Sequence, residues 1–295
     1  MGASVGAVFG AGWQVSLPSG IEGTRLRQEL EVLLDTIDRD FSPWRKDSTL
    51  ARFNSGGAGK MVVLREIVTV TSTALQIAGA SDGCFDPTVG PLVGRWGFGP
   101  IRKSDAPVEG WRRLAAGFGH IAKTEPGITL DLCGIAKGHA LDRMVSLLLD
   151  AGHESFLIDL GGELAARGRR PSGESWRIGV EDPRLDRDGL AGVLRLDGMA
   201  VATSGDRANG YDLDHRRYSH IIDPATREPV TGALASVSVL MESACLADGW
   251  ATALMAAGDA GPTLADRNGI SALFLFRDGA NLRRVLTGTF GRHFA

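Results

Sequence analysis

The sequence predicts an α+β (mixed α/β) protein, in which helices flank a sheet core that two lobes share. Three observations lead to this prediction. Apolar residues recur at helical spacing in the first half of the chain, and short strand patterns follow one another between residues 155 and 240. No repeat, low-complexity linker or clear domain boundary interrupts the 295 residues, so we expect residues 1–295 to form a single domain.

The expected helices and strands follow from these patterns. Leu26, Leu30 and Leu34 recur at helical spacing and predict an amphipathic helix. The predicted helices span residues 21–40, 64–78, 135–149 and 245–257. The predicted strands span residues 13–17, 155–160, 176–181, 192–196, 199–203, 218–222, 236–240 and 270–276. Pro87 and Pro91 forbid a continuous helix and predict a shaped loop that enters a short helix.

Composition and charge exclude several classes of function. The net charge is −3 and no run of Lys or Arg exceeds a few residues, so we expect no nucleic-acid partner, and no segment indicates a membrane span. Cys84, Cys133 and Cys245 are far apart and form no Cys-x-x-Cys pair, which argues against a disulfide framework and a zinc site. The first residues show neither a signal peptide nor a lipobox, so we expect a cytoplasmic protein.

The segment at residues 130–138 is the first candidate ligand site. It places Asp131, two glycines and Lys137 at a predicted strand-to-helix junction. Gly134 and Gly138 let a ligand approach the backbone, the free N–H groups of a helix N-terminus favour an anion, and Lys137 adds a positive charge. These features are typical of a site for a phosphorylated ligand. Taken alone, Lys137 can also be a solvated lysine and Asp131 a capping residue.

Asp248 and Thr252 are candidates for a metal site. They are four residues apart in a predicted helix and therefore share one of its faces. A carboxylate and a hydroxyl presented in this way suit Mg²⁺, which takes further oxygens from water and from substrate phosphates. The alternative is a packing helix in which Asp248 caps the N-terminus and Thr252 bonds back to a carbonyl.

His220 is the best candidate for a catalytic base among the six histidines. It lies in a predicted strand that ends at an Asp-Pro turn. A histidine can take a proton from an attacking hydroxyl near neutral pH, although an isolated histidine in a strand can also be a structural hydrogen-bonding group. Thr203 and Ser204 lie where another strand breaks at Gly205, and they can line an anion site or form an ordinary turn.

Together these segments resemble the ApbE family, the bacterial FAD:protein FMN transferases. The resemblance rests on the order and spacing of many segments, and it extends from about Phe9 to the C-terminus. The matching segments span residues 42–54, 85–93, 96–99, 130–138, 159–162, 180–183, 202–206, 219–224 and 246–252. The resemblance implies an ApbE-like fold of two lobes, with a mixed, largely antiparallel sheet core and a cleft that holds FAD.

The resemblance also implies an activity. Members transfer the FMN moiety of FAD, with Mg²⁺, to a Ser or Thr hydroxyl of an acceptor flavoprotein through a phosphoester bond, and AMP leaves. The metal ligands are then Asp248, Thr252 and the backbone carbonyl of Gly134, and His220 helps to remove the proton of the hydroxyl. The residues expected to bind the substrate FAD are Phe9, Cys84, Phe85, Asp86, Asp131, Lys137, Thr203, Ser204 and Ile222.

A few positions depart from the family pattern. Cys133 stands where Gly or Ser is usual, Gly249-Trp250 replaces Ala-Leu, and Glu163 replaces a common Asn. None of these changes removes a proposed metal or catalytic group, although Gly249 should weaken its helix by about 1 kcal/mol relative to Ala. Many relatives are exported lipoproteins, so the missing export signal predicts a cytoplasmic acceptor or a sequence without its natural N-terminus.

Two other functions stay open. An Mg²⁺-dependent FAD pyrophosphatase would use the same site with water as the nucleophile and would release FMN and AMP. A flavin-binding carrier would hold FAD without turnover, but His220, Asp248 and Thr252 together argue against it, because binding alone needs no base beside a metal. The sequence does not distinguish water from a protein hydroxyl, because that choice depends on how the acceptor docks.

Overall fold

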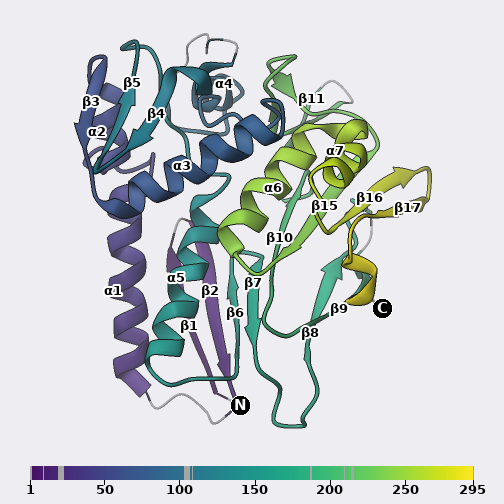
Figure 1. Ribbon diagram of the computed structural model, residues 1–295. Coiled ribbons are helices and arrows are strands. Elements are labelled where there is room, and N and C mark those ends of the chain that lie inside the picture. The colour runs from purple at the N-terminus through teal and green to yellow at the C-terminus, as the bar shows by residue number, and fades with distance from the viewer. Residues whose placement is uncertain are drawn as a thin grey trace.

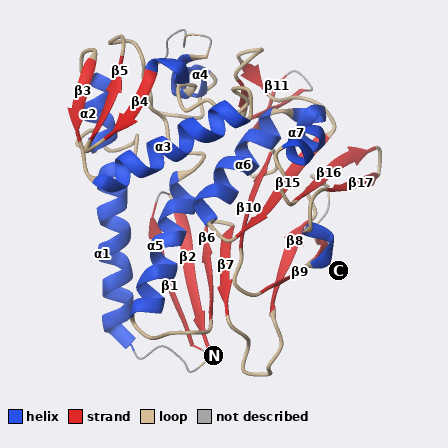
Figure 2. Cartoon of the chain, in the orientation of Figure 1, coloured by secondary structure: helices blue, strands red, loops and turns tan. Residues whose placement is uncertain are grey.

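An eight-stranded sheet runs through the centre of the molecule, and helices cover one of its faces (Figures 1 and 2). The computed structural model describes residues 2–8, 10–18, 23–102, 107, 109–186, 188–208, 210–213 and 216–294. The strands, in their order across the sheet, are β1 (Gly2–Val8), β2 (Ala11–Leu17), β6 (Phe156–Leu160), β7 (Glu163–Arg167), β10 (Ala200–Gly205), β15 (Leu234–Met241), β16 (Ala272–Asp278) and β17 (Asn281–Leu286). Each neighbouring pair is antiparallel.

Three long helices lie on the covered face, and a fourth crosses beside them (Figure 1). They are α1 (Gly23–Phe41), α5 (Ala136–Asp150), α6 (Ala244–Ala256) and the crossing helix α3 (Arg65–Ala80). The shorter helices are α2 (Thr49–Ser55), α4 (Gly90–Arg95) and α7 (Gly261–Arg267). Within the described residues, no helix is both long and apolar enough to cross a lipid bilayer.

Four smaller sheets surround the large one. They are the three-stranded sheet of β3 (Gly59–Val62), β5 (His120–Lys123) and β4 (Leu114–Gly117), and the pairs β8 (Trp176–Glu181) with β9 (Leu190–Leu196), β11 (Gly210–Leu213) with β12 (Arg216–Ser219), and β13 (Ile222–Asp223) with β14 (Glu228–Pro229). Trp176 and Leu194 pack with Leu273 and Leu275 of β16 in a second core cluster. The pair β8–β9 therefore forms a second hydrophobic cluster with the large sheet, separate from the main core that the helices cover.

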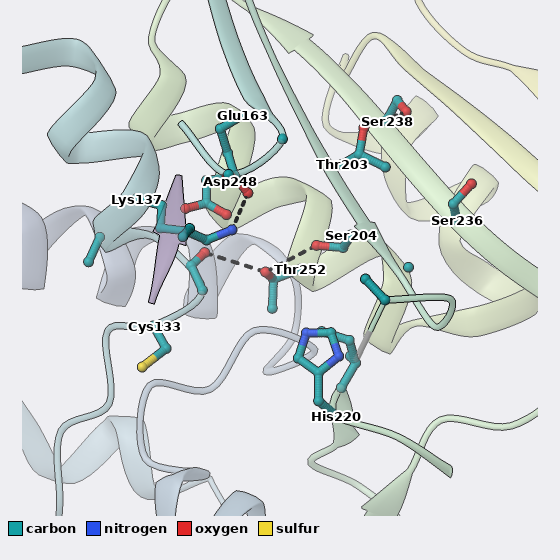
Figure 3. Close-up of a pocket in the computed structure, with 18 of the residues that line it drawn as sticks. Cys133, Lys137, Glu163, Thr203, Ser204, His220, Ser236, Ser238, Asp248 and Thr252 are labelled. Carbon is teal, nitrogen blue, oxygen red and sulfur yellow. Dashed lines mark hydrogen bonds and ion pairs between the residues drawn. The ribbon is translucent and has the colours of Figure 1, made fainter. Parts of the chain in front are cut away.

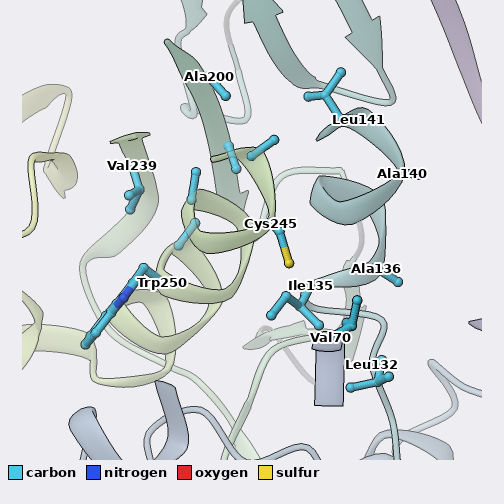
Figure 4. Close-up of a cluster of buried hydrophobic side chains, with 14 of the residues drawn as sticks. Val70, Leu132, Ile135, Ala136, Ala140, Leu141, Ala200, Val239, Cys245 and Trp250 are labelled. Atoms are coloured by element: carbon cyan, nitrogen blue, oxygen red, sulfur yellow. The ribbon is translucent and has the colours of Figure 1, made fainter. Parts of the chain in front are cut away.

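Helix α6 lies in the main core, as its alanine-rich sequence allows. Cys245 and Trp250 are buried in one cluster with Ile135 and Val70, which come from the start of α5 and from α3 (Figure 4). A methyl group at Gly249 would lie 2.5 Å from Cδ1 of Ile77. The glycine that weakens the helix therefore permits the close approach of α3.

The predicted α+β fold class is confirmed, and the four long helices begin and end within two residues of the predicted bounds. One predicted strand is wrong. Residues 218–222 do not form a continuous strand, because β12 ends at Ser219 and β13 begins at Ile222. The Ser219 hydroxyl accepts a hydrogen bond from the N–H of Ile221 (3.1 Å), and this local bond replaces strand pairing at His220. Ser204 does not form a turn either, since β10 continues to Gly205.

Helices α5 and α6 cross closely at Gly138, and each caps the other. A Cβ atom on Gly138 would lie 2.2 Å from the carbonyl oxygen of Ala244. The Gly138 N–H donates to Oδ2 of Asp248 in α6 (3.0 Å). One turn later, Asp142 of α5 accepts the hydroxyl of Ser243 (2.7 Å) and the first two N–H groups of α6 (2.7 and 3.0 Å). Each helix therefore satisfies the N-terminal donors of its partner.

Gly138→Ala should lower the free energy of unfolding by about 1–3 kcal/mol, because the methyl group would overlap the Ala244 carbonyl and force α6 away. The gain in helix propensity, about 1 kcal/mol, should not offset this strain. Denaturant unfolding followed by circular dichroism measures the change. Gly57→Ala is the control, since a methyl group there meets nothing within 4 Å. Equal stability of the two variants would contradict the close crossing.

Candidate functional site

A cavity of about 960 Å³ collects nearly all the candidate residues. Its volume is at the upper end of the range of roughly 300–1,000 Å³ that is typical of small-molecule sites. The candidates that line it are Cys84, Phe85, Asp86, Asp131, Gly134, Lys137, Thr203, Ser204, His220, Ile222, Asp248 and Thr252. Phe9 lies outside the described residues, so its contact with FAD stays a prediction.

Three elements bring oxygen atoms together at Thr252 (Figure 3). The Thr252 hydroxyl of α6 lies 3.4 Å from the carbonyl oxygen of Gly134 and 3.4 Å from the hydroxyl of Ser204 in β10. Gly134 must be small here, because a Cβ atom would lie 3.0 Å from Oγ1 of Thr252 and 3.2 Å from the ring of Phe85. The glycine therefore brings its carbonyl close to the cavity face of α6.

Asp248 stands one helical turn before Thr252 and is only 4% exposed. Burial raises the pKa of its carboxyl group above the usual range, while Lys137 and the N–H of Gly138 oppose that shift. Asp248 does not cap its own helix, since Ser243 does so by accepting the N–H of Leu246. It caps α5 instead, so the anion at this helix N-terminus is the protein's own carboxylate.

Lys137 forms an ion pair that the sequence did not predict. Its Nζ atom lies 2.5 Å from Oε1 of Glu163, which is 3% exposed (Figure 3). Gly161 and Gly162, both at positive φ, form the two-residue turn that places Glu163 at the start of β7. Burial lowers the pKa of Lys137, but Glu163 and Asp248 raise it overall. Burial and Asp248 raise the pKa of Glu163 to about 7, against the effect of Lys137.

The oxygens around Thr252 fit a small, hard cation. In the described part of the chain, no three His, Cys, Asp or Glu side chains gather to hold a metal. Carbonyl, carboxylate and hydroxyl donors suit Mg²⁺, which keeps several water or phosphate ligands. Neighbouring ligands of Mg²⁺ are about 3 Å apart, as its 2.0–2.1 Å bonds require. The 3.4 Å separation of Gly134 O and Thr252 Oγ1 is close to that spacing.

His220 lies at the end of a row of aromatic rings. Trp96 stacks on Tyr218 with ring centroids 5.4 Å apart, and Tyr218 stacks on Tyr211 at 5.4 Å. Tyr211 stacks on Phe98 at 5.2 Å, and the edge of Phe98 meets the ring of His220 at 6.3 Å. These rings join the hairpin β11–β12 to the loop after α4, and His220 follows that hairpin into the cavity wall.

Asp86 and Asp131, two of the candidate residues, accept hydrogen bonds within their own loops. Oδ1 of Asp86 accepts the N–H (2.8 Å) and hydroxyl (2.6 Å) of Thr88. Oδ1 of Asp131 accepts the N–H of Cys133 (2.9 Å), three residues before α5 begins at Ala136. Asp131 therefore stabilises a turn and does not cap the helix. Burial raises the pKa of both carboxyl groups.

Thr203 and Ser204 both line the cavity, but their side chains have different partners. They are successive residues of β10, so their side chains point to opposite faces of the strand. The hydroxyl of Ser204 approaches Thr252, whereas that of Thr203 pairs with Oγ of Ser238 in β15 at 2.8 Å (Figure 3). Only Ser204 therefore belongs to the oxygen cluster.

Sequence reasoning missed Trp44 as a cavity residue. Its side chain lines the cavity and is 60% exposed, which is unusual for a large apolar ring. The signal in the sequence is an isolated aromatic residue in the turn-rich segment 41–44. An exposed ring at a cavity rim can stack on a planar ligand.

Cys133 should resist alkylation although it lines the cavity. Burial raises the pKa of its thiol well above the usual value, and only the thiolate reacts. At pH 8, native Cys133 should react with iodoacetamide more slowly than in denatured protein, because a smaller fraction of the thiol is ionised. Peptide mass spectrometry after timed quenching measures both rates. Equal rates would show that this thiol is not protected.

Comparison with known proteins gives a consistent result. The ApbE family model matches residues 7–274. The FAD:protein FMN transferase of Vibrio cholerae serotype O1 is 34% identical over 94% of this chain and 86% of its own length. That of Escherichia coli K12 is 31% identical over 97% of this chain and 87% of its own length.

Solved structures agree with the sequence relatives. The flavin transferase ApbE from Vibrio cholerae superposes with a TM-score of 0.88 at 31% identity, over 99% of this chain and 98% of the other. The apo form of the Pseudomonas stutzeri flavinyl transferase ApbE gives a TM-score of 0.87 at 34% identity, over 99% and 96% of the two chains.

Proposed function

Because the chain belongs to the ApbE family, we propose how its cavity carries out the transfer of FMN from FAD to an acceptor protein. The enzyme is a transferase, FAD is its substrate, and a protein is the acceptor. Our proposal concerns the metal, the acceptor residue and the roles of individual side chains.

One observation carries the proposal: Gly134, Asp248, Thr252 and His220 share the wall of one cavity. We assign the Gly134 carbonyl, the Asp248 carboxylate and the Thr252 hydroxyl to Mg²⁺, because their donor types suit this ion and the first and third lie 3.4 Å apart. When bound, Mg²⁺ neutralises charge on the pyrophosphate of FAD as the bond to AMP breaks. The reciprocal capping of α5 and α6 holds Asp248 in place for this role.

His220 is the general base in this proposal. It takes the proton from a Ser or Thr hydroxyl of the acceptor, and the hydroxyl oxygen forms a bond to the FMN-side phosphorus. The phosphorus–oxygen bond to AMP breaks, and AMP leaves. The ring of Phe98 packs at a steep angle against the imidazole, with ring centroids 6.3 Å apart.

Lys137 supports the phosphates of FAD. Its ammonium group has three donors, and Glu163 uses one of them. The others can reach an anion in the cavity that Lys137 lines. The remaining wall residues, Cys84, Phe85, Asp86, Asp131, Ser204 and Ile222, shape the space for the nucleotide.

The primary test is the intact mass of a candidate acceptor domain after incubation with the enzyme, FAD and Mg²⁺. A gain of one FMN, with AMP in solution, would support the proposal. Free FMN and AMP without a mass gain would favour the pyrophosphatase, and intact FAD with a competent acceptor would favour a carrier. A chelator control tests the need for the metal.

Asp248→Asn should lower Mg²⁺-dependent FMN transfer at least about 100-fold, because the variant lacks the carboxylate charge at the metal. Asparagine keeps an oxygen that can accept the Gly138 N–H, so the contact between α5 and α6 should persist. Transfer rates across a range of Mg²⁺ concentrations, beside Asp248→Ala, measure the effect. Wild-type rates in both variants would remove Asp248 from the metal site.

His220→Ala should slow FMN transfer about 10²–10⁴-fold while FAD still binds, because the variant lacks the base but keeps the nucleotide contacts. Single-turnover transfer and FAD fluorescence titration separate the two effects. His120→Ala is the control, since His120 does not line the cavity. An unchanged transfer rate in His220→Ala would exclude the proposed base.

A further inference from the structure

Glu163 has an oxygen that the protein leaves without a hydrogen bond. The residue is 3% exposed and lines the cavity. Oε1 pairs with Lys137, but Oε2 is buried and accepts no hydrogen bond from any described residue. A buried carboxylate oxygen without a partner is costly, so a group that compensates its charge should stabilise this wall.

The charges around Glu163 are also unbalanced. Two buried carboxylates, those of Glu163 and Asp248, lie near one ammonium group, that of Lys137 (Figure 3). Asp248 receives only a backbone N–H, from Gly138. Lys137 therefore pairs with one carboxyl group, and the other, that of Asp248, has no cationic side chain within ion-pair distance among the described residues. Carboxylate oxygens in such a setting favour a hard divalent cation.

We propose that Glu163 is part of the cation site, and that it gives the enzyme affinity for Mg²⁺ before FAD binds. Its carboxyl group lies beside that of Asp248 (Figure 3) and would add negative charge at the cation site. This inference rests on the Mg²⁺ site of the proposed function and extends it to a residue outside the set Gly134, Asp248 and Thr252.

The charge balance explains why the cation should bind first. A pyrophosphate that entered the cavity alone would meet the uncompensated carboxylate, and the ammonium group of Lys137 is already paired with Glu163. A bound divalent cation reverses the local charge and attracts the pyrophosphate. In this proposal, Glu163 contributes to the cation site and also favours the binding of Mg²⁺ before FAD.

The other explanation for Glu163 is that it only orients Lys137. Glu163→Gln separates the two explanations, because glutamine keeps an oxygen for Lys137 but removes the negative charge. If Glu163 only orients Lys137, the affinity for free Mg²⁺ should not change. If Glu163 belongs to the cation site, that affinity should fall.

The test is calorimetric titration of the full-length, metal-free enzyme with MgCl₂ in the absence of FAD. We expect the wild type to bind Mg²⁺ and Glu163→Gln to bind it at least tenfold more weakly. Glu181→Gln is the matched control, because Glu181 lines the same cavity but is 72% exposed and pairs with Arg207. It should bind Mg²⁺ as the wild type does.

Equal affinity in Glu163→Gln and the wild type would overturn the inference, as would a wild type that binds no Mg²⁺ without FAD. If Glu163→Gln unfolds at a lower temperature, Glu163→Asp, which keeps the charge, must bind Mg²⁺ more tightly than Glu163→Asn. Asp248→Asn separates this inference from the proposed function. Loss of binding in Asp248→Asn, with normal binding in Glu163→Gln, would retain the metal site and exclude Glu163 from it.

Discussion

The reciprocal capping of α5 and α6 is the interaction on which the rest of the site depends. It requires a residue without a side chain at Gly138, since the carbonyl of Ala244 occupies the space of a Cβ atom. Asp142 of α5 accepts hydrogen bonds from the N-terminal N–H groups of α6. Asp248 of α6 accepts one from the first turn of α5. Because the bond between Gly138 and Asp248 is buried and those to Asp142 are partly buried, a shift of either helix would leave several polar groups unpaired. The crossing therefore fixes where the cavity face of α6 lies relative to the Gly134 loop.

The two halves of the chemistry rest on different kinds of support. The oxygens assigned to the cation come from the buried helix α6 and from the closely packed loop that carries Gly134. His220 comes from the chain that follows a small hairpin, at the end of a row of stacked rings. A charged phosphate requires fixed ligands, whereas a hydroxyl from another protein approaches from outside. In the proposed mechanism, this division would keep the charged ligands of the phosphate fixed and leave the proton acceptor on a separate, less tightly packed segment.

The long helices were predictable because the spacing of leucine and alanine reflects which side of a helix is buried. The residues that line the cavity were predictable from the resemblance of the ordered segments. Pairings between distant residues were not predictable from local patterns. Lys137 was expected at a phosphate, but Glu163 takes one of its donors through a turn of two glycines. Asp248 was considered as a cap for its own helix, yet it caps α5. The predicted strand at 218–222 failed because Ser219 competes for the backbone, an effect that alternation of apolar residues does not report.

The hairpin β11–β12 is paired within itself and is not a part of the eight-stranded sheet, so far as the described strands show. Stacked rings tolerate sliding and exchange among Phe, Tyr and Trp better than hydrogen-bonded ladders tolerate a change of register. Substitutions can therefore accumulate along Trp96, Tyr211 and Tyr218 while the buried oxygens of the cavity stay unchanged. If the proposed acceptor approaches past His220, changes in these rings would alter which proteins fit there and would leave the nucleotide chemistry behind them unchanged.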